Sequence, residues 1–206
     1  MSEHGFDDGS PDHEDSHARI RHDVAHGGMT AAEYDALPEG HLRPELIDGV
    51  LHIPPGRDAT HQTLTALLAA DLFQSAPVDI GVTQAVEIRL APNLRYIPDI
   101  LAVRVNTLGG KDRHQFDAHE VVLVGEVVSP TTRSMDRILK PRHYAEYGVP
   151  WFWRIETEDG LLVTAHEIDP TTGIYVESGK FTDRITLDAP WPIDLDLTPL
   201  VRALDL

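Results

Sequence analysis

The apolar and polar positions of this chain predict short helices and strands that begin near Met29. Thr30 and Glu33 have the spacing of a capping box, which predicts a short helix that ends before Pro38. Residues 45–53 then form two short apolar runs around an Asp-Gly dipeptide, a strong hairpin signal because such a turn requires positive φ. We therefore expect a helix and an N-terminal β-hairpin at the start of the ordered chain.

Longer periodic segments follow the hairpin. Leucines at helical spacing predict an amphipathic helix from Asp58 or Thr60 to Phe73, with one apolar face made of Leu64, Leu67, Leu68 and Leu72. Apolar runs predict strands over residues 82–90, 96–105, 121–128 and 151–155, of which the last three are expected to be central. The remaining pattern predicts a helix over about 134–147, outer antiparallel strands over 161–168, 173–178 and 185–187, and a short helix from about residue 198.

This order of elements predicts an α/β fold of the α+β type, with a central mixed β-sheet flanked by helices. We expect one domain over residues 29–206. Residues 1–28 have few large apolar side chains, and hold five of the twelve histidines and seven acidic residues against two arginines. Because such a composition cannot bury enough surface to offset chain entropy, we expect a disordered, acidic, histidine-rich tail.

Composition narrows the chemistry. The absence of cysteine excludes disulfides, thiolate metal sites and thiol nucleophiles, so any metal must be held by oxygen or imidazole. The formal net charge is −17, so the general field of the protein repels nucleic acid and anionic membranes. No apolar run approaches the roughly 20 residues that span a bilayer, and the N-terminus lacks the pattern of a signal peptide. We therefore expect a cytoplasmic protein.

Two acidic residues interrupt predicted apolar strands. Period-two alternation places Asp99 on the face of its strand that carries Ile97 and Leu101. It places Glu126 on the same face as Val122, Val124 and Val128. Burying a carboxylate costs several kcal/mol (about 3 or more) unless it is paired, protonated or bound to a cation. Either a metal ion or a bridging arginine, Arg95 or Arg104, would compensate these charges.

Further residues fit a metal site at this position. Glu45 opens the hairpin strand and would be a third carboxylate, unless it simply faces water. Oxygen ligands of this kind are preferred by Mg²⁺ or Mn²⁺, which promote phosphodiester hydrolysis when a lysine such as Lys140 lies nearby. Asp136, four residues before this lysine, could instead form an ordinary exposed ion pair with it. His61 is either a hydrogen-bonded core histidine or a group that contacts phosphate or water.

The chain resembles a known protein family in the order and spacing of several motifs. These motifs are Glu45-Leu46-Ile47-Asp48-Gly49, Pro98-Asp99, Glu126-Val127-Val128-Ser129-Pro130-Thr131-Thr132, Asp136, Lys140, Tyr144 and Gly148-Val149-Pro150-Trp151-Phe152-Trp153. Over about residues 29–167 the chain resembles the Uma-type putative restriction endonuclease family of the PD-(D/E)XK nuclease superfamily. The resemblance implies a restriction-endonuclease-like core and a divalent-metal nuclease site. It also implies that Glu45, Asp99, Glu126 and Lys140 are catalytic, that the three acids are metal ligands, and that His61 and Asp136 are accessory.

Two features depart from the general superfamily pattern. The lysine expected two residues after the second acid is replaced by Val128, and the resemblance assigns its role to Lys140. Pro141 follows this lysine directly, so we expect Lys140 at a kink or at the start of a helix. The aromatic side chains of the motif, Tyr144 among them, are interpreted as packing residues.

Two functions follow from these observations. The first is an endonuclease that depends on Mg²⁺ or Mn²⁺ and acts on DNA, with RNA or a small phosphodiester as alternative substrates and a homodimer as the simplest assembly. Binding would need a local basic rim, drawn from Arg89, Arg95, Arg104, Lys111, Arg113, Arg133, Arg137, Lys140 and Arg142. The second is a non-catalytic interaction or regulatory module of nuclease fold that retains an acidic metal site.

Overall fold

A computed structural model of the chain describes residues 28–37, 44–104 and 113–205. The tail predicted over residues 1–28 lies outside the described residues except for its last glycine, and Lys111 also lies outside them. Within the described residues, no helix has both the length and the apolar character needed to cross a membrane.

The largest element is a six-stranded mixed sheet with the order β11-β10-β9-β8-β6-β3. Strands β8 and β9 are parallel and every other neighbouring pair is antiparallel. The strands are β3 (Ile80–Gln84), β6 (Ile100–Arg104), β8 (Val121–Val127), β9 (Trp151–Glu156), β10 (Leu162–Ile168) and β11 (Tyr175–Phe181). Every residue of β8 is buried, which confirms its predicted central place.

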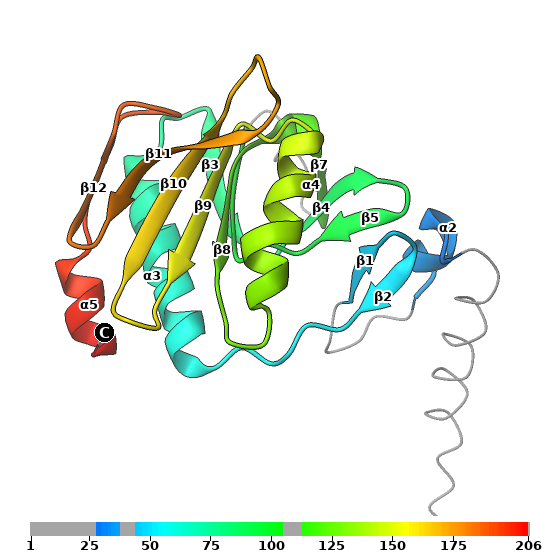
Figure 1. The fold of residues 1–206 in the computed structure, drawn as a ribbon, viewed down its shortest axis with the longest axis horizontal. Helices are drawn as coiled ribbons and strands as arrows, with labels where there is room; N and C mark the ends of the chain where they lie inside the picture. Colours follow the sequence, from blue (N-terminus) through cyan, green and yellow to red (C-terminus); the bar gives the residue numbers. More distant parts are fainter. Residues whose placement is uncertain (1–27, 38–43, 105–112, 206) are drawn as a thin grey trace, which may run out of the picture.

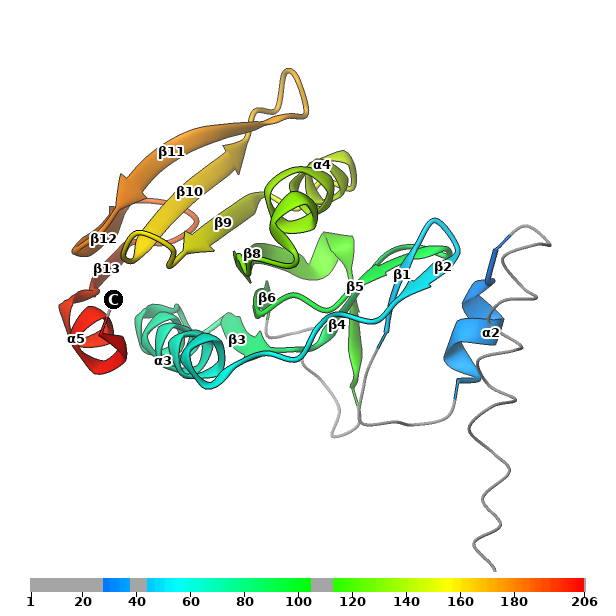
Figure 2. The same cartoon turned by 60° about the horizontal axis from the view of Figure 1, so that its bottom comes forward.

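Elements on both faces cover this sheet (Figures 1 and 2). Alternate residues of β6 and β9 enter two separate apolar cores, as the two-residue period requires, and in β8 Leu123 faces one core and Val124 the other. The helices α3 (Ala59–Ser75) and α5 (Thr198–Leu204) and the ribbon of β12 (Arg184–Leu187) and β13 (Ile193–Asp196) pack on one face. Helix α4 (Lys140–Glu146) packs on the other face, which is also the side of Glu126.

A second, smaller sheet with the order β2-β1-β5-β4-β7 extends beside this core. It consists of β1 (Glu45–Ile47), β2 (Val50–His52), β4 (Glu87–Ala91), β5 (Leu94–Tyr96) and β7 (Gln115–Asp117). The predicted hairpin is present, and Asp48 and Gly49 adopt the expected positive φ of 51° and 78°. The predicted capping box of Thr30 and Glu33 also forms, at the start of α2 (Ala31–Asp35).

Two predicted strands are broken in the structure. The run 82–90 divides between β3 and β4 in different sheets, and Ala85 at the break has a φ of 50°. The run 96–105 divides between β5 and β6, because Pro98 has no N–H to donate to a sheet. Asp99 therefore lies in the connection just before β6, and the predicted strand face around it does not exist.

The segment around Lys140 also differs from a simple helix. A π-helix, Met135–Leu139, leads directly into α4, and Lys140 is the first residue of α4 with helical φ and ψ of −58° and −48°. Lys140 is thus the first residue of α4, as expected, but it follows a helical turn directly. Its N–H donates to the carbonyl of Met135, and the wider π turn accommodates Pro141, which has no N–H to donate. Leu67 was predicted in the apolar face of α3 but is 39% exposed, because the buried face turns through Thr65 and Ala69 instead. The short strands β7 and β13 were not predicted.

Candidate active site

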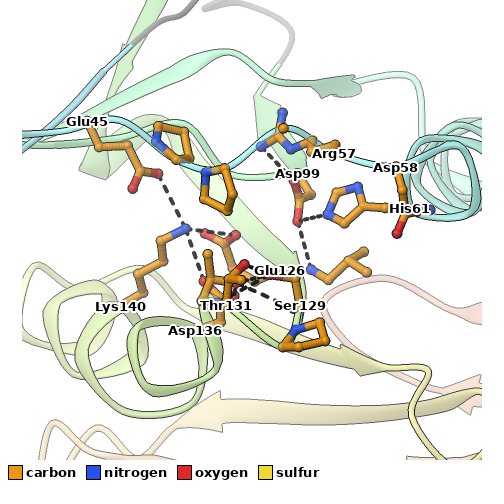
Figure 3. Close-up of a pocket in the computed structure, with 16 residues that line it drawn as sticks. Glu45, Arg57, Asp58, His61, Asp99, Glu126, Ser129, Thr131, Asp136 and Lys140 are labelled. Carbon is orange, nitrogen blue, oxygen red and sulfur yellow. Dashed lines mark hydrogen bonds and ion pairs between the residues drawn. The ribbon is translucent and has the colours of Figure 1, made fainter.

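A cavity of about 160 Å³ lies where the ends of several elements meet. Its walls come from β1, the loop 54–58, the first turn of α3, the residue before β6, the end of β8, the loop 129–132, the π-helix and α4. Figure 3 shows that the charged side chains form two groups within it. We call them the Lys140 cluster, which comprises Glu45, Glu126, Asp136 and Lys140, and the Asp99 cluster, which comprises Arg57, His61 and Asp99.

In the Lys140 cluster, one ammonium group lies among three carboxylates. Lys140 Nζ is 3.3 Å from Glu45 Oε1, 3.2 Å from Glu126 Oε2 and 3.3 Å from Asp136 Oδ1. All four residues are buried. Burial alone would lower the pKa of Lys140, but the neighbouring carboxylates raise it well above its usual value. Lys140 is therefore a permanent cation at neutral pH.

Glu126 is the most deeply buried carboxylate of the Lys140 cluster. Its Oε1 accepts a hydrogen bond of 2.7 Å from the hydroxyl of Tyr144, and its Oε2 faces Lys140. Burial raises the pKa of Glu126 to about 8, with Lys140 opposing the change and the charges of Asp99, Asp136 and Glu45 adding to it. Burial thus favours the protonated form of Glu126 unless a further cation compensates its charge.

Local hydrogen bonds fix the other two acids of the Lys140 cluster. Glu45 Oε1 accepts the backbone N–H of Ile97 at 3.1 Å, which links β1 to the chain just before Asp99. Asp136 accepts a short hydrogen bond from the hydroxyl of Thr132, at the turn that follows β8. Both carboxylates are therefore held toward Lys140 rather than toward water.

In the Asp99 cluster the charges are reversed, with one carboxylate among cationic and donor groups. Asp99 Oδ1 lies 2.7 Å from Arg57 Nη2, and Asp99 Oδ2 lies 3.2 Å from His61 Nε2. The backbone N–H of Val127 also donates to Oδ2, at 2.8 Å. Burial alone would raise the pKa of Asp99, but the hydrogen bond and charge of His61, together with Arg57 and Val127, lower it. Asp99 is an anion at neutral pH.

The start of α3 positions His61. Asp58 caps the helix by accepting the backbone N–H of His61 at 2.8 Å, and this places the imidazole toward Asp99. The Nδ1 atom of His61 is buried and has no hydrogen-bond partner among the described residues. His61 therefore belongs to the cavity rather than to the apolar core beneath α3.

The structure brings all six predicted site residues, Glu45, His61, Asp99, Glu126, Asp136 and Lys140, to this cavity. Three alternative interpretations of these residues were wrong. Arg95 does not bridge the acids, because its side chain pairs with Asp35 at 2.5 Å and Glu87 at 3.2 Å. Arg104 instead donates to the backbone carbonyl of His119. The Asp136–Lys140 pair is buried rather than exposed, and Glu45 is buried rather than facing water.

Sequence reasoning missed two residues of the site. Arg57 is one of them, since it lies in a loop without periodicity; the available signal was its place just before the helix-capping Asp58 and His61. Tyr144 was assigned to packing, and it does pack against Tyr96 and Phe152, but its hydroxyl also donates to Glu126.

The donor chemistry of the cavity suits a hard divalent cation. Asp99 and Glu126 both line it, and the charge of each disfavours ionisation of the other, a conflict that a cation between them would relieve. Across residues 28–37, 44–104 and 113–205, no three His, Asp or Glu side chains are arranged to hold a metal ion as they stand. The carboxylates are instead held by the cations Lys140 and Arg57.

Most arginines of the predicted basic rim have acidic partners in the part of the chain that the structure describes. Arg133 Nη2 lies 2.8 Å from Glu158 Oε1, and Arg137 Nη2 lies 2.5 Å from Glu156 Oε1. Acidic side chains also pair with Arg89, Arg95 and Arg113. These acids neutralise much of the positive charge of the predicted rim, and Arg142 is an exposed member of it without an ion pair among the described residues.

Comparison with known proteins identifies the fold and the family. The structure is similar to the crystal structure of a protein from Anabaena variabilis ATCC 29413, described as a putative nuclease belonging to DUF820. The TM-score is 0.66 at 16% sequence identity, over 85% of this chain and 99% of that one, which shows a shared fold. A search of curated proteins found no match. Residues 31–199 match the sequence profile of the Uma2 family, described as putative restriction endonuclease, and the chain therefore belongs to that family.

Proposed function

We propose that this protein is an endonuclease that hydrolyses phosphodiester bonds in DNA and depends on Mg²⁺ or Mn²⁺. The observation that carries the proposal is that Asp99, Glu126 and Lys140 meet in one cavity, although they come from three separate segments of the chain. Membership of a family described as putative restriction endonuclease supports the same reaction class. The fold shared with a protein described as a putative nuclease is consistent with it.

Asp99 and Glu126 would hold the metal ion, with Glu45 as a further carboxylate ligand. When bound, the ion would supply Lewis acidity toward the phosphoryl oxygens and lower the pKa of water. Glu126 must give up its proton to act as a ligand, so ligation is coupled to proton release at its carboxylate. Asp99 is already ionised and needs no such change.

Lys140 would act by its charge rather than as a base. Its ammonium group is held protonated by three carboxylates and therefore cannot accept a proton from water at neutral pH. A fixed cation at this position keeps Glu126 oriented and lowers the cost of bringing a phosphate into an otherwise acidic cavity.

The reaction class is tested with a panel of substrates. Purified protein is incubated with supercoiled plasmid, single-stranded DNA, single-stranded RNA and a chromogenic phosphodiester, each with Mg²⁺, Mn²⁺ or chelator. The proposal predicts nicking of plasmid that requires metal and stops in chelator. If only RNA or only the small phosphodiester is hydrolysed, that compound and not DNA is the substrate class. If none of the four substrates is hydrolysed, the proposal is overturned.

One observation favours a second candidate, a non-catalytic module that binds metal. The ammonium of Lys140 forms ion pairs with three carboxylates, and Val128 occupies the position where the general superfamily pattern has its lysine. This candidate predicts that calorimetry detects Mn²⁺ binding by a protein that cleaves nothing in the panel.

Assembly can be tested alongside the reaction. A two-fold dimer places one site on each strand of a duplex, so the proposed homodimer predicts linear as well as nicked plasmid products. Sedimentation of the protein alone should then give about 46 kDa, twice the 22.8 kDa of one chain. A mass of one chain with nicked product only would contradict the dimer and leave the reaction itself intact.

A further inference from the structure

Three basic side chains that line the cavity differ in access. The side chains of Lys140 and His61 are 8% and 11% exposed, whereas the side chain of Arg57 is 33% exposed. Arg57 follows the Pro54-Pro55-Gly56 segment and reaches the cavity from the loop before α3 (Figure 3). Of these three side chains, Arg57 is the one that an incoming ligand meets first.

The hydrogen bonds of Arg57 to the described residues engage only one of its three guanidinium nitrogens. Its bonds to Asp99 Oδ1, at 2.7 Å, and to the carbonyl of Ile97, at 3.3 Å, both come from the single atom Nη2. A guanidinium group has five N–H donors in one plane, so the three on Nη1 and Nε remain for a ligand. The bond to Asp99 therefore orients the guanidinium plane and leaves these three donors for an incoming anion.

Lys140 cannot serve the same purpose. Its ammonium has three N–H donors and faces three carboxylates at 3.2–3.3 Å, so a phosphate would have to displace one of them. A phosphate that enters this acidic cavity still needs a positive partner, since like charges at short range are strongly unfavourable.

We propose that Arg57 binds the substrate phosphate at the mouth of the cavity, through its charge and its Nη1 and Nε donors, and so positions the scissile bond beside Asp99 and Glu126. This inference rests on the proposed function, because it names the residue that recognises the substrate of the same site. Arg57 is then a substrate-binding residue, and its pairing with Asp99 in the absence of substrate holds it ready.

A purely structural role makes a different prediction. If Arg57 only neutralises Asp99, its loss lowers stability and leaves the dependence of DNA binding on salt unchanged. If it contacts phosphate, its loss removes one released counterion, and the slope of log Kobs against log salt concentration falls by about 0.9 for a duplex. The salt slope therefore separates the two roles.

The experiment measures binding of a fluorescently labelled DNA duplex by anisotropy over a range of salt concentrations, with Ca²⁺ present and the DNA checked to be intact. Wild type is compared with Arg57→Gln, Arg57→Lys and the control Arg184→Gln, which removes an exposed arginine on β12. Circular dichroism and thermal melting verify that each variant is folded. Plasmid nicking is measured on the same preparations.

For Arg57→Gln we expect roughly tenfold to a hundredfold weaker binding and a slope lower by about 0.9. Arg57→Lys should recover the slope but only part of the affinity, because it restores the charge without the planar set of N–H donors. Arg184→Gln should match wild type.

Four outcomes are distinguishable. Nicking by wild type with an unchanged slope in Arg57→Gln would overturn the phosphate contact and leave the nuclease function standing. A lower salt slope for Arg57→Gln than for wild type, with no nicking by wild type, would support the phosphate contact and overturn the proposed hydrolysis. Nicking with the lower slope supports both, and a wild type that neither binds nor nicks overturns both.

Discussion

The two clusters of the cavity combine acidic and basic side chains in opposite arrangement. The Lys140 cluster surrounds one cation with three carboxylates and is closed to solvent, whereas the Asp99 cluster surrounds one carboxylate with Arg57, His61 and a backbone amide and is open on the side of Arg57. The two environments shift carboxyl pKa values in opposite directions. The pKa of Glu126 is raised in the Lys140 cluster, and the pKa of Asp99 is lowered in the Asp99 cluster.

This difference separates two tasks within one site. In the closed cluster Lys140 alone does not balance the charge of three carboxylates, so a further cation would stabilise their ionised forms. In the open cluster, Arg57 and its exposed donors can receive an anion without large rearrangement. The difference therefore supports the two proposals made above, which are cation binding between Glu126 and Asp99 and phosphate binding on the side of Arg57.

Removing the central cation should have the largest effect. Lys140→Met leaves Glu45, Glu126 and Asp136 buried without their partner, and breaking a buried ion pair in this way costs about 3–5 kcal/mol of unfolding free energy. Urea unfolding measures this loss, and nicking should disappear. The control Lys180→Met removes a half-exposed lysine paired with Glu177 and should leave both unchanged. A Lys140→Met protein as stable as wild type would mean that the closed cluster is not charged as described.

The dependence of stability on pH should come next in size. Because the folded-state pKa of Glu126 is raised from 4.5 to about 8, the folded protein holds a proton between these pH values that the unfolded chain has released. This group therefore makes stability fall as pH rises from 4.5 to 8, by at most about 1.4 kcal/mol per pH unit.

Glu126→Gln should remove this contribution. Its unfolding free energy, measured by urea titration across the same pH range, should vary less with pH than that of wild type. Equal slopes for the two proteins would show that Glu126 is ionised in the fold, and would contradict the proton assigned to it.

The smallest of these effects tests the hydroxyl that orients Glu126. Tyr144→Phe keeps the ring in its packed position and removes the donor to Glu126 Oε1, which should cost about 1–3 kcal/mol of unfolding free energy. The matched control is Tyr147→Phe, one turn further along the chain on an exposed side chain, and its cost should be negligible. Similar losses in both variants would show that the Tyr144 hydroxyl contributes no special support to the site.

Local signals made part of this fold predictable from sequence. The capping box at Thr30, the Asp-Gly hairpin and the leucine period of α3 each depend on residues that are close in the chain, and all three appear in the structure. Strand β8 was also predictable, because a near-continuous apolar run is typical of a strand that is covered on both faces. All seven of its residues are buried.

Pairing between distant segments was less predictable. Pro98 and the positive φ of Ala85 divide two apolar runs between separate sheets, and a hydrophobic pattern alone does not record such a break. The gathering of Glu45, Asp99, Glu126 and Lys140 was predicted from acids that interrupt apolar runs, supported by the family resemblance, and not from a local folding signal. Arg57 was not found, because a loop residue carries no periodic signal and its partner Asp99 lies 42 positions away in the chain.

The most direct test of the proposed site is plasmid nicking by wild type, Asp99→Asn and Glu126→Gln, each with Mn²⁺ and with chelator and each verified to be folded. The account predicts nicking by wild type that needs Mn²⁺ and is lost in both variants. Nicking that persists in chelator, or that either variant retains at the rate of wild type, would contradict it.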